Sequence, residues 1–443
     1  YGLFNHNIAY EIRLQQAMEE KLLCPFHYFG ITDLEVDGHV IDDDDLKNVQ
    51  NFAKLVCDDR VQYIMQQIEY YGYSGDRVKG LMFCSSKEEA KTLSVKFNMR
   101  GLRTIVLTGD SSQNEREDAI LRLEQNKQEN ALDYILTVDI FNEGVDVPAV
   151  NQVIMLRPTE SPIVFIQQLG RGLRKYAGKE YVVILDFIGN YMNNFMIPIA
   201  LSGDRTYNKD NIRRYVMEGG RGIPGASTVH FDEISRKRIF ASVDNANFSD
   251  IKLIKENYNN LKNKLGRIPA LRDFDDYGEM DVIRIFDNNS LGSYYKFLVK
   301  YEKEYKIRLS ENEEKVIEFV SKKLANGKRI QELRMLKRML AYARGSSKLG
   351  LFAGLSEDMK EYGKIVSQNQ KENIVNVMTN EFPAGSGKKT YSQCVFIEDD
   401  GTDYKPTKTF MQMLLNDKFY EMLQELVEFG IRRYERNYKN TYK

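Results

Sequence analysis

The stretch 133–175 constrains the fold more than any other part of the sequence, because two short apolar segments and a helix follow one another with polar turns between them. The apolar residues at 134–136 and 153–156 have the length of buried strands. Ser161 and Pro162 then open a helix, the serine as its N-cap and the proline as its first helical residue. Strand, turn, strand and helix in this order predict an α/β domain with a mainly parallel sheet.

The polar residues of this stretch suit a site that handles phosphate groups. The turn contains Thr137, Gly144, Asp146 and Pro148, and the helix presents Gln167, Gly170, Arg171 and Arg174. A rigid sheet that holds a loop and two cations at one edge can position such a site. We therefore expect the turn and the arginines to lie together at one edge of the sheet.

Two motifs in this stretch carry a family resemblance. The ordered pair T-x8-D-x-P (137–148) and Q-x-x-G-R-x-x-R (167–174) resembles motifs V and VI of superfamily 2 helicases and translocases. Residues 1–235 are most similar to the helicase part of type III restriction subunits (Res-like), and the remainder resembles DUF3427-like helicases. The resemblance implies a RecA-like three-layer α/β/α domain with a mainly parallel sheet, followed by a mostly α-helical C-terminal region.

The resemblance also implies that ATP and Mg²⁺ are cofactors. Arg174 would be the principal arginine finger at the γ-phosphate, Arg171 its companion, and Gln167 a hydrogen-bonding partner nearby. Gly144 and Asp146 would approach the nucleotide, the aspartate through the ribose hydroxyl or through Arg171. Two simpler alternatives remain open: Arg171 pairs with a carboxylate, and Asp146 caps a turn.

Two further strands carry polar residues at the positions of nucleic-acid contacts in this family. GLMFCSS (80–86) lies where motif IV is expected, and TIVLTGD (104–110) lies where motif IVa is expected. The resemblance implies that four residues hold a phosphate backbone, a contact that grips without reading sequence; these are Thr137, Thr108, Gly109 and Ser85. Ser85 and Ser86 fit helix caps equally well.

The chain lacks a recognisable phosphate cradle and Walker B strand. GSGKK (385–389) departs from G-x-x-x-x-G-K-[ST], because Phe382 stands where the first glycine belongs and Lys389 where Ser or Thr belongs. VHFDEIS (229–235) imitates a Walker B strand, but it follows motif VI instead of preceding motif IV. We therefore expect a first motor domain, in cis and N-terminal to this chain, to bind most of the ATP and Mg²⁺, and we expect the chain alone not to hydrolyse ATP.

Composition limits the partners. Lys and Arg number 63 and Asp and Glu 64, a net charge of −1, so a nucleic-acid surface is expected to be a local groove. The four cysteines and four histidines are scattered, which predicts neither disulfides nor a metal site. Apolar runs stay shorter than the roughly 18 residues of a membrane span, so we expect a cytoplasmic protein that does not cross a membrane.

The patterns divide the chain into four segments. We expect 1–40 to be the exit segment of the first RecA-like domain, 41–205 the second RecA-like domain with motifs IV to VI, 206–245 a linker, and 246–443 a helical accessory region of one or two subdomains. The last predicted helix ends in IRRYERNYK, which fits either a nucleic-acid grip or an ordinary solvated helix face.

Together these features predict the second motor domain and accessory region of an ATP-dependent DNA helicase or translocase. One alternative is a non-catalytic module, built on a degenerate helicase domain, that binds nucleic acid or protein. The other is an RNA helicase. Gln167 stands where DEAD-box RNA helicases carry histidine, and this difference, with the resemblance to restriction subunits, favours DNA.

Overall fold

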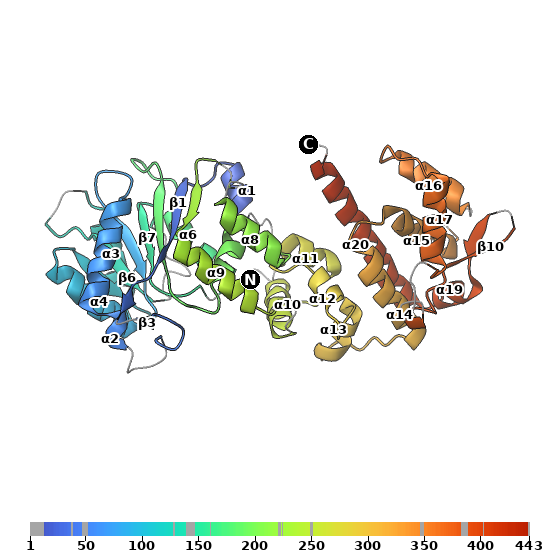
Figure 1. Cartoon of the computed structure of the whole chain (residues 1–443), viewed down its shortest axis with the longest axis horizontal. Helices are drawn as coiled ribbons and strands as arrows, with labels where there is room; N and C mark the ends of the chain where they lie inside the picture. The colour runs from blue at the N-terminus through green and yellow to red at the C-terminus, as the bar shows by residue number, and fades with distance from the viewer. Residues whose placement is uncertain are drawn as a thin grey trace. The chain divides into compact units, whose positions relative to one another are not determined.

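The computed structural model forms two compact units (Figure 1). It describes residues 13–36, 39–46, 52–126, 129–138, 147–159, 161–219, 223, 225–248, 251–345, 350–381, 389–401 and 403–441. The first unit contains residues 10–248, and the second contains residues 249–443. Each unit buries its own set of apolar side chains and is described by itself.

The first unit is built on a seven-stranded sheet in which neighbouring strands are parallel. The strand order is β5-β6-β4-β7-β8-β1-β9. The bounds are β1 Phe26–Thr32, β4 Gly80–Phe83, β5 Thr104–Leu107, β6 Tyr134–Thr137, β7 Gln152–Met155, β8 Val182–Ile188 and β9 Thr228–Phe231. A separate antiparallel pair joins β2 (Glu35–Val36) to β3 (His39–Val40). The predicted parallel α/β sheet is confirmed.

Helices cover both faces of the large sheet, which gives the expected three layers (Figure 1). On one face, Val61 of α3 and Leu93 of α4 share a hydrophobic cluster with Leu136 of β6. On the other face, the ring of Phe165 in α6 lies 6.1 Å from that of Tyr28 in β1. The helices are α1 Leu14–Glu19, α2 Phe52–Leu55, α3 Asp58–Tyr71, α4 Lys87–Met99, α5 Gln113–Glu124, α6 Pro162–Gly172, α7 Met196–Ser202, α8 Lys209–Glu218 and α9 Glu233–Asn245.

The structure places two segments differently from the sequence-based prediction. β1, expected in the exit segment of another domain, is hydrogen-bonded between β8 and β9 in this sheet. The expected linker at 206–245 instead forms α8, β9 and α9. Asp232, the first acid of the Walker B-like pair, caps α9 by accepting from the Ser235 N–H at 2.6 Å and also accepts from the Thr32 N–H at 2.6 Å. Asp232 therefore joins α9 to the end of β1, and the unit extends to residue 248.

The second unit is mostly helical, as expected for the C-terminal region. Its helices are α10 Ile251–Leu265, α11 Leu271–Tyr277, α12 Ile283–Asp287, α13 Tyr294–Tyr301, α14 Glu311–Phe319, α15 Ile330–Ala343, α16 Leu351–Lys360, α17 Gln368–Met378, α19 Lys408–Met413 and α20 Asp417–Thr441. A π-helical turn, Val320–Leu324, continues α14, and β10 (Ile397–Asp399) pairs with β11 (Tyr404–Pro406). In the described part of the chain, no helix combines the length and the apolar composition that crossing a bilayer requires.

The basic end of α20 is neutralised by acidic side chains near α11. Arg432 contacts Asp276, and Arg436 contacts Asp275 at 2.7 Å. Arg433 forms two hydrogen bonds with a further carboxylate, that of Asp281, at 2.8 and 2.7 Å. Guanidinium groups held in this way have fewer donors left for phosphate. The ion pairs favour the structural alternative for the IRRYERNYK segment over a nucleic-acid grip.

We expect the stability of the first unit to depend on pH through Asp186 of β8. This carboxyl group is buried and accepts a hydrogen bond from the Tyr28 hydroxyl at 2.5 Å. Burial raises its pKa to about 7, although the Tyr28 hydrogen bond acts in the opposite direction. Because the unfolded pKa is about 3.9, the native state binds the proton more tightly, and the folded state loses stability as pH rises from about 4 to 7.

Asp186→Asn should remove this penalty. Relative to the wild type, the variant should gain about 2–3 kcal/mol in unfolding free energy between about pH 5 and pH 8. Urea unfolding at the two pH values measures the difference. Asp118→Asn is the control, because Asp118 lies on the surface and forms an exposed ion pair with Arg122. Equal pH dependence in both variants would contradict the assignment.

Candidate functional site

Three strands end level with one another, and this sets where the candidate nucleic-acid residues lie. The last residues of β4 and β5 each pair with Thr137, the last residue of β6. Because the strands are parallel, their carboxyl ends form one edge of the sheet. Ser85 lies two residues after the end of β4, and Thr108 and Gly109 are the first two residues after β5. The structure therefore brings these three residues and Thr137 to the same edge.

Thr108 and Gly109 form the start of a tight turn. The Thr108 carbonyl accepts from the Ser111 N–H at 3.0 Å, and the Ser111 hydroxyl accepts from the Thr108 N–H at 3.0 Å. A β-carbon added at Gly109 would meet no atom within 4 Å, so the backbone is open to approach at this point.

Arg116 adds a cation at this edge that the motif-based prediction missed. Its guanidinium donates to the Gly109 carbonyl at 3.2 Å. Ser112 and Glu115 form the capping box that begins α5, so Arg116 follows directly in the helix after motif IVa. That position was visible in the sequence, but nothing local indicated that the side chain folds back over the turn.

The structure separates the roles considered for Ser85 and Ser86. Ser86 is the N-cap of α4 and accepts from the Glu89 N–H at 3.1 Å. The Ser85 N–H donates to the Glu89 carboxylate at 2.7 Å. The Ser85 hydroxyl lies 3.5 Å from the Leu156 carbonyl, which is a marginal hydrogen bond. Ser85 is partly exposed, so its hydroxyl keeps capacity for an outside partner.

A buried ion network holds the backbone beneath motif IV. Arg60 of α3 is fully buried and contacts Asp33 at 2.8 Å and Glu89 at 3.2 Å. It also donates to the Leu55 carbonyl at 2.7 Å. Burial raises the pKa of Glu89, while the Arg60 charge lowers it. Although burial alone would lower the pKa of Arg60, the charges of Asp33 and Glu89 raise it above its ordinary value. The network thus joins β1, α3 and α4 under Ser85.

Arg60→Met should destabilise the first unit strongly. The change would leave Asp33 and Glu89 buried without their cation, and breaking a buried pair typically costs about 3–5 kcal/mol. Urea unfolding measures the loss. The control is Arg100→Ala, which removes an ion pair to the exposed Asp58 and should cost under about 1 kcal/mol. A loss at Arg60 no larger than the loss at Arg100 would show that the network contributes little.

Thr137 lies beneath the edge instead of projecting from it. Its side chain is fully buried, and no hydrogen-bond partner of its hydroxyl lies among the described residues. Its carbonyl accepts from the Cys84 N–H at 2.9 Å, which ties it to the end of β4. The predicted contact of Thr137 with a phosphate backbone therefore stays a prediction. Gly144 and Asp146 lie outside the described residues, and their predicted roles are not addressed by the structure.

The arginine helix ends at the opposite edge of the sheet. α6 has 11 residues, about 16 Å of helix, and leads from the carboxyl end of β7 back to the start of β8. Gly172, at its end, packs against Val150 and against Val182, the first residue of β8. Arg171 and Arg174 consequently lie at the amino edge. The expectation that the turn and the arginines share one edge stays a prediction, because residues 139–146 lie outside the described residues; the end of the turn, at Pro148, lies near the end of α6.

Lys179 connects these two motifs and was missed by the sequence analysis. Its ammonium group donates to the Pro148 carbonyl at 2.5 Å, the Val150 carbonyl at 3.0 Å and the Gly172 carbonyl at 2.9 Å. The first two carbonyls close the motif V turn, and the third belongs to the last residue of α6. One cation therefore fixes the end of motif V against the helix of motif VI. Near this helix end, Arg174 and Gln167 are exposed and Arg171 is partly exposed.

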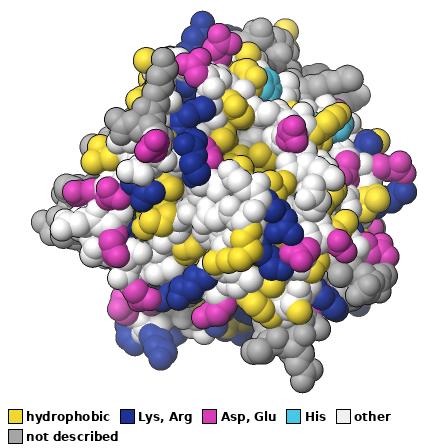
Figure 2. Space-filling view, turned by 90° about the vertical axis from the view of Figure 1, so that its left-hand side faces the viewer, with side chains coloured by type: hydrophobic (Ala, Val, Ile, Leu, Met, Phe, Trp, Pro, Cys, Tyr) yellow, Lys and Arg dark blue, Asp and Glu magenta, His cyan; other side chains and the backbone are white. Residues whose placement is uncertain are grey.

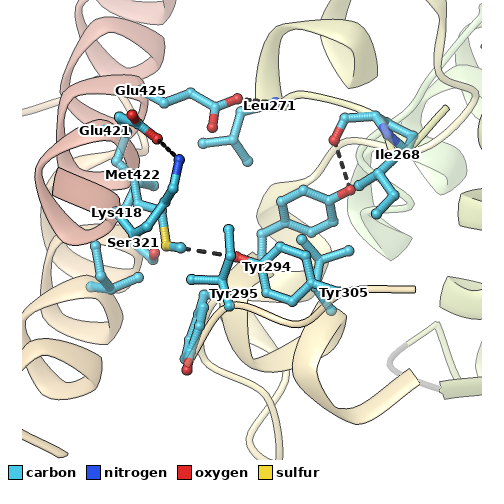
Figure 3. Close-up of a pocket in the computed structure, with 15 residues that line it drawn as sticks. Ile268, Leu271, Tyr294, Tyr295, Tyr305, Ser321, Lys418, Glu421, Met422 and Glu425 are labelled. Carbon is cyan, nitrogen blue, oxygen red and sulfur yellow. Dashed lines mark hydrogen bonds and ion pairs between the residues drawn. The ribbon is translucent and has the colours of Figure 1, made fainter. Parts of the chain in front are cut away.

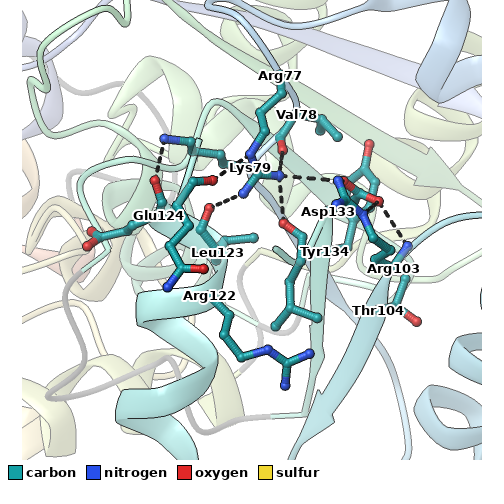
Figure 4. A network of polar contacts seen from close by, with 12 residues as sticks. Arg77, Val78, Lys79, Arg103, Thr104, Arg122, Leu123, Glu124, Asp133 and Tyr134 are labelled. Carbon is teal, nitrogen blue, oxygen red and sulfur yellow. Dashed lines mark hydrogen bonds and ion pairs between the residues drawn. The ribbon is translucent and has the colours of Figure 1, made fainter. Parts of the chain in front are cut away.

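A second cationic network closes the amino edge at β4, β5 and β6 (Figure 4). Arg77 donates to the carbonyls of Gln125 at 2.8 Å and Leu123 at 2.6 Å, at the end of α5. Lys79 donates to the neighbouring Glu124 carbonyl at 2.8 Å. Cations suit a helix C-terminus, where carbonyls lack partners. These two basic residues therefore stabilise α5 and have little capacity for a ligand.

The surface charge of the first unit is mixed. Figure 2 shows Lys and Arg side chains interspersed with Asp and Glu on the face toward the left of Figure 1. Lys96 of α4 and Arg100, directly after this helix, both pair with Asp58 of α3 at 2.9 Å. Among the described residues, no cluster of three or more His, Cys, Asp or Glu side chains has the arrangement of a metal site.

Two family profiles match parts of this chain. Residues 59–176 match the family profile of the helicase conserved C-terminal domain. Residues 59–176 therefore form a helicase C-terminal domain. Residues 254–439 match a domain of unknown function, DUF8090, which covers most of the second unit.

Relatives of this helicase domain are similar over part of the chain. A putative ATP-dependent helicase of Saccharomyces cerevisiae, IRC3, is 34% identical over 109 residues, which is 25% of this chain and 15% of that protein. A 51.5 kDa protein of a Lactococcus phage (isolate 7-9) is 24% identical over 181 residues, 40% of this chain and 37% of the phage protein. The chain thus spans well under half the length of these relatives.

Among solved structures, one match is the ATP-dependent Type ISP restriction-modification enzyme LlaBIII bound to DNA. The alignment covers 91% of this chain and 28% of the LlaBIII chain, at 16% identity and a TM-score of 0.35.

Proposed function

We propose that this chain is the second motor domain and accessory region of an ATP-dependent DNA helicase or translocase. The observation that carries the proposal is the separation of two sets of residues on one rigid sheet. Hydroxyl and glycine residues of motifs IV and IVa lie at the carboxyl edge, and Arg171 and Arg174 lie at the amino edge. A motor of this kind needs both a strand-gripping surface and cations that meet a nucleotide held by another domain.

A first motor domain in cis would hold most of the ATP and Mg²⁺, and the ATP would supply the phosphoryl group. The residues of this chain fit a complementary role, because Arg174 is exposed and follows closely after the end of α6, which Lys179 holds. Arg174, with Arg171 beside it, would neutralise negative charge on the γ-phosphate oxygens, and Gln167 would hydrogen-bond nearby. Gly144 and Asp146 would border the nucleotide.

At the carboxyl edge, Ser85, Thr108, Gly109 and Thr137 would hold the phosphate backbone of a DNA strand. Arg116 would strengthen that grip, since its guanidinium lies directly over the exposed turn at Gly109. The contacts would give affinity without sequence preference. Relatives with the same domain include proteins named as RNA helicases, such as MJ1505 of Methanocaldococcus jannaschii, so RNA is the alternative substrate in the tests below.

Arg174→Ala should abolish nucleic-acid-stimulated ATP hydrolysis by the full-length protein. Loss of an arginine finger typically lowers the rate by about 10³ to 10⁵, and nucleotide binding should persist because the first motor domain holds most of the ATP. Steady-state ATPase assays with single-stranded DNA, duplex DNA and RNA measure the effect. Arg213→Ala, on α8, is the matched control. A wild-type protein that no nucleic acid stimulates would instead support the non-catalytic binding module.

Arg116→Ala should weaken binding of this chain to single-stranded DNA without changing sequence preference. Each phosphate contact contributes about 0.9 to the magnitude of the slope of log affinity against log salt for duplex DNA and about 0.7 for single strands. With single-stranded DNA, the magnitude of the slope should therefore fall by about 0.7. Fluorescence anisotropy over a salt series measures it.

Arg122→Ala is the control for this experiment, because Arg122 lies near the other end of α5 and donates to the Asn130 carbonyl. Equal losses in the two variants would remove Arg116 from the nucleic-acid surface. Tighter binding of RNA than of DNA at the same salt concentration would overturn the choice of DNA.

A further inference from the structure

The second unit contains a cavity of about 240 Å³ that no part of the proposed motor function uses (Figure 3). One wall comes from α20, a second from α13 and the segment that follows it, a third from the start of α11 with the residues before it, and a fourth from α14 and its π-helical turn. Cavities for drug-sized ligands measure about 300–1,000 Å³. A cavity slightly below this range fits an occupant about the size of one amino-acid side chain.

Aromatic and apolar side chains make up most of the cavity lining. Tyr294, Tyr295 and Tyr305 contribute three rings, and Met422 lies opposite them on α20 (Figure 3). The Tyr294 hydroxyl donates to the Pro269 carbonyl at 2.8 Å, so this ring is held in place. The Tyr305 hydroxyl donates to the Met422 sulfur at 3.8 Å, and a thioether sulfur is a weak acceptor. The rings thus form an aromatic wall in which Tyr294 is held in place.

Two polar groups in the lining are incompletely satisfied. Glu425 accepts from the Leu271 N–H at 2.6 Å through one carboxylate oxygen, and none of the described residues donates to its other oxygen. Ser321, on the π-helical turn, is 1% exposed, and its hydroxyl has no hydrogen-bond partner among the described residues. Buried polar groups normally have partners. π-Helical turns often occur at functional sites, and this one places Ser321 in the cavity wall.

The carboxylate groups around the cavity favour a positively charged ligand. Glu421 and Glu425 line the α20 wall, and Lys418 is already paired with Glu421 at 2.8 Å. Burial raises the pKa of Glu425, and the charges of Asp273 and Glu428 act in the same direction, whereas the Leu271 N–H and the charge of Arg272 oppose it. A bound cation would relieve this unfavourable burial of a carboxylate, whereas a phosphate group would be repelled.

We propose that this cavity binds a guanidinium group, supplied by an arginine side chain of a partner protein or by a small free guanidine. The planar cation would donate to the open oxygen of Glu425 and to the Ser321 hydroxyl, and its flat faces would lie against the tyrosine rings. Guanidinium is suited to both contacts, because it forms strong hydrogen bonds with carboxylates and is attracted to aromatic rings. The site is independent of the ATP and DNA contacts proposed for the first unit.

Isothermal titration calorimetry of the whole chain tests this proposal with defined probes. Agmatine represents a free guanidine, and a blocked Gly-Arg-Gly peptide represents a protein side chain. The matched Gly-citrulline-Gly peptide keeps the shape but lacks the charge. We expect the arginine peptide or agmatine to bind and the citrulline peptide to bind at least about tenfold more weakly. The tighter of the two cationic probes identifies the source of the group.

Glu425→Gln should weaken binding of the cationic probe by roughly tenfold or more. The amide keeps the acceptor for the Leu271 N–H but removes the negative charge. Glu428→Gln is the matched control, since Glu428 is exposed on the same helix and does not line the cavity. Ser321→Ala should weaken binding less and should not lower the melting temperature, because it removes an unpaired buried hydroxyl.

Three outcomes would overturn the proposal. Equal binding of the arginine and citrulline peptides would show that charge is not recognised. Equal effects of Glu425→Gln and Glu428→Gln would show that the cavity is not the site. Competition of the bound cationic probe by a short single-stranded oligonucleotide, with unchanged binding of that oligonucleotide in Glu425→Gln, would assign the cavity to nucleic acid instead.

Discussion

Parallel pairing in a common register is the constraint on which the first unit depends. Because β4, β5 and β6 end level with one another, the residues that follow them must meet at one edge. The same pairing forces each crossover helix to return across the sheet before the next strand can begin. The residues proposed to grip a strand and the residues proposed to meet a nucleotide are therefore separated by the length of the strands, on a single rigid body.

Buried and partly buried cations keep this body rigid. Arg60 joins three elements beneath motif IV, and Lys179 joins the end of motif V to the end of motif VI. Both side chains bind carboxylate or carbonyl oxygens of the protein itself. In a chain with a net charge of −1, cations used in this way leave few for a ligand. The phosphate-binding edge proposed above would therefore depend on local groups such as Arg116.

The local sequence was sufficient to predict features whose interacting residues lie within a few positions of one another. β6, β7, and the start of α6 at Ser161 and Pro162 followed from apolar run length and cap chemistry. The inclusion of β1 and β9 in the sheet could not be predicted in this way, because parallel neighbours are set by contacts between distant segments that leave no local pattern. The positions of Lys179 and Arg116 were hidden for the same reason: a long basic side chain looks alike in sequence whether it binds a distant carbonyl or extends into solvent. The sequence could not show at which edge of the sheet the arginines lie, because this depends on the length and direction of α6.

The ion pairs at the end of α20 give the second unit a particular response to salt. Arg432, Arg433 and Arg436 serve as internal counterions for aspartates that would otherwise repel one another. Dissolved ions screen such exposed or half-exposed pairs. Raising the ionic strength should thus loosen the attachment of this helix end to α11, so that salt acts on the folding of the accessory region itself and separately from any effect on a bound strand.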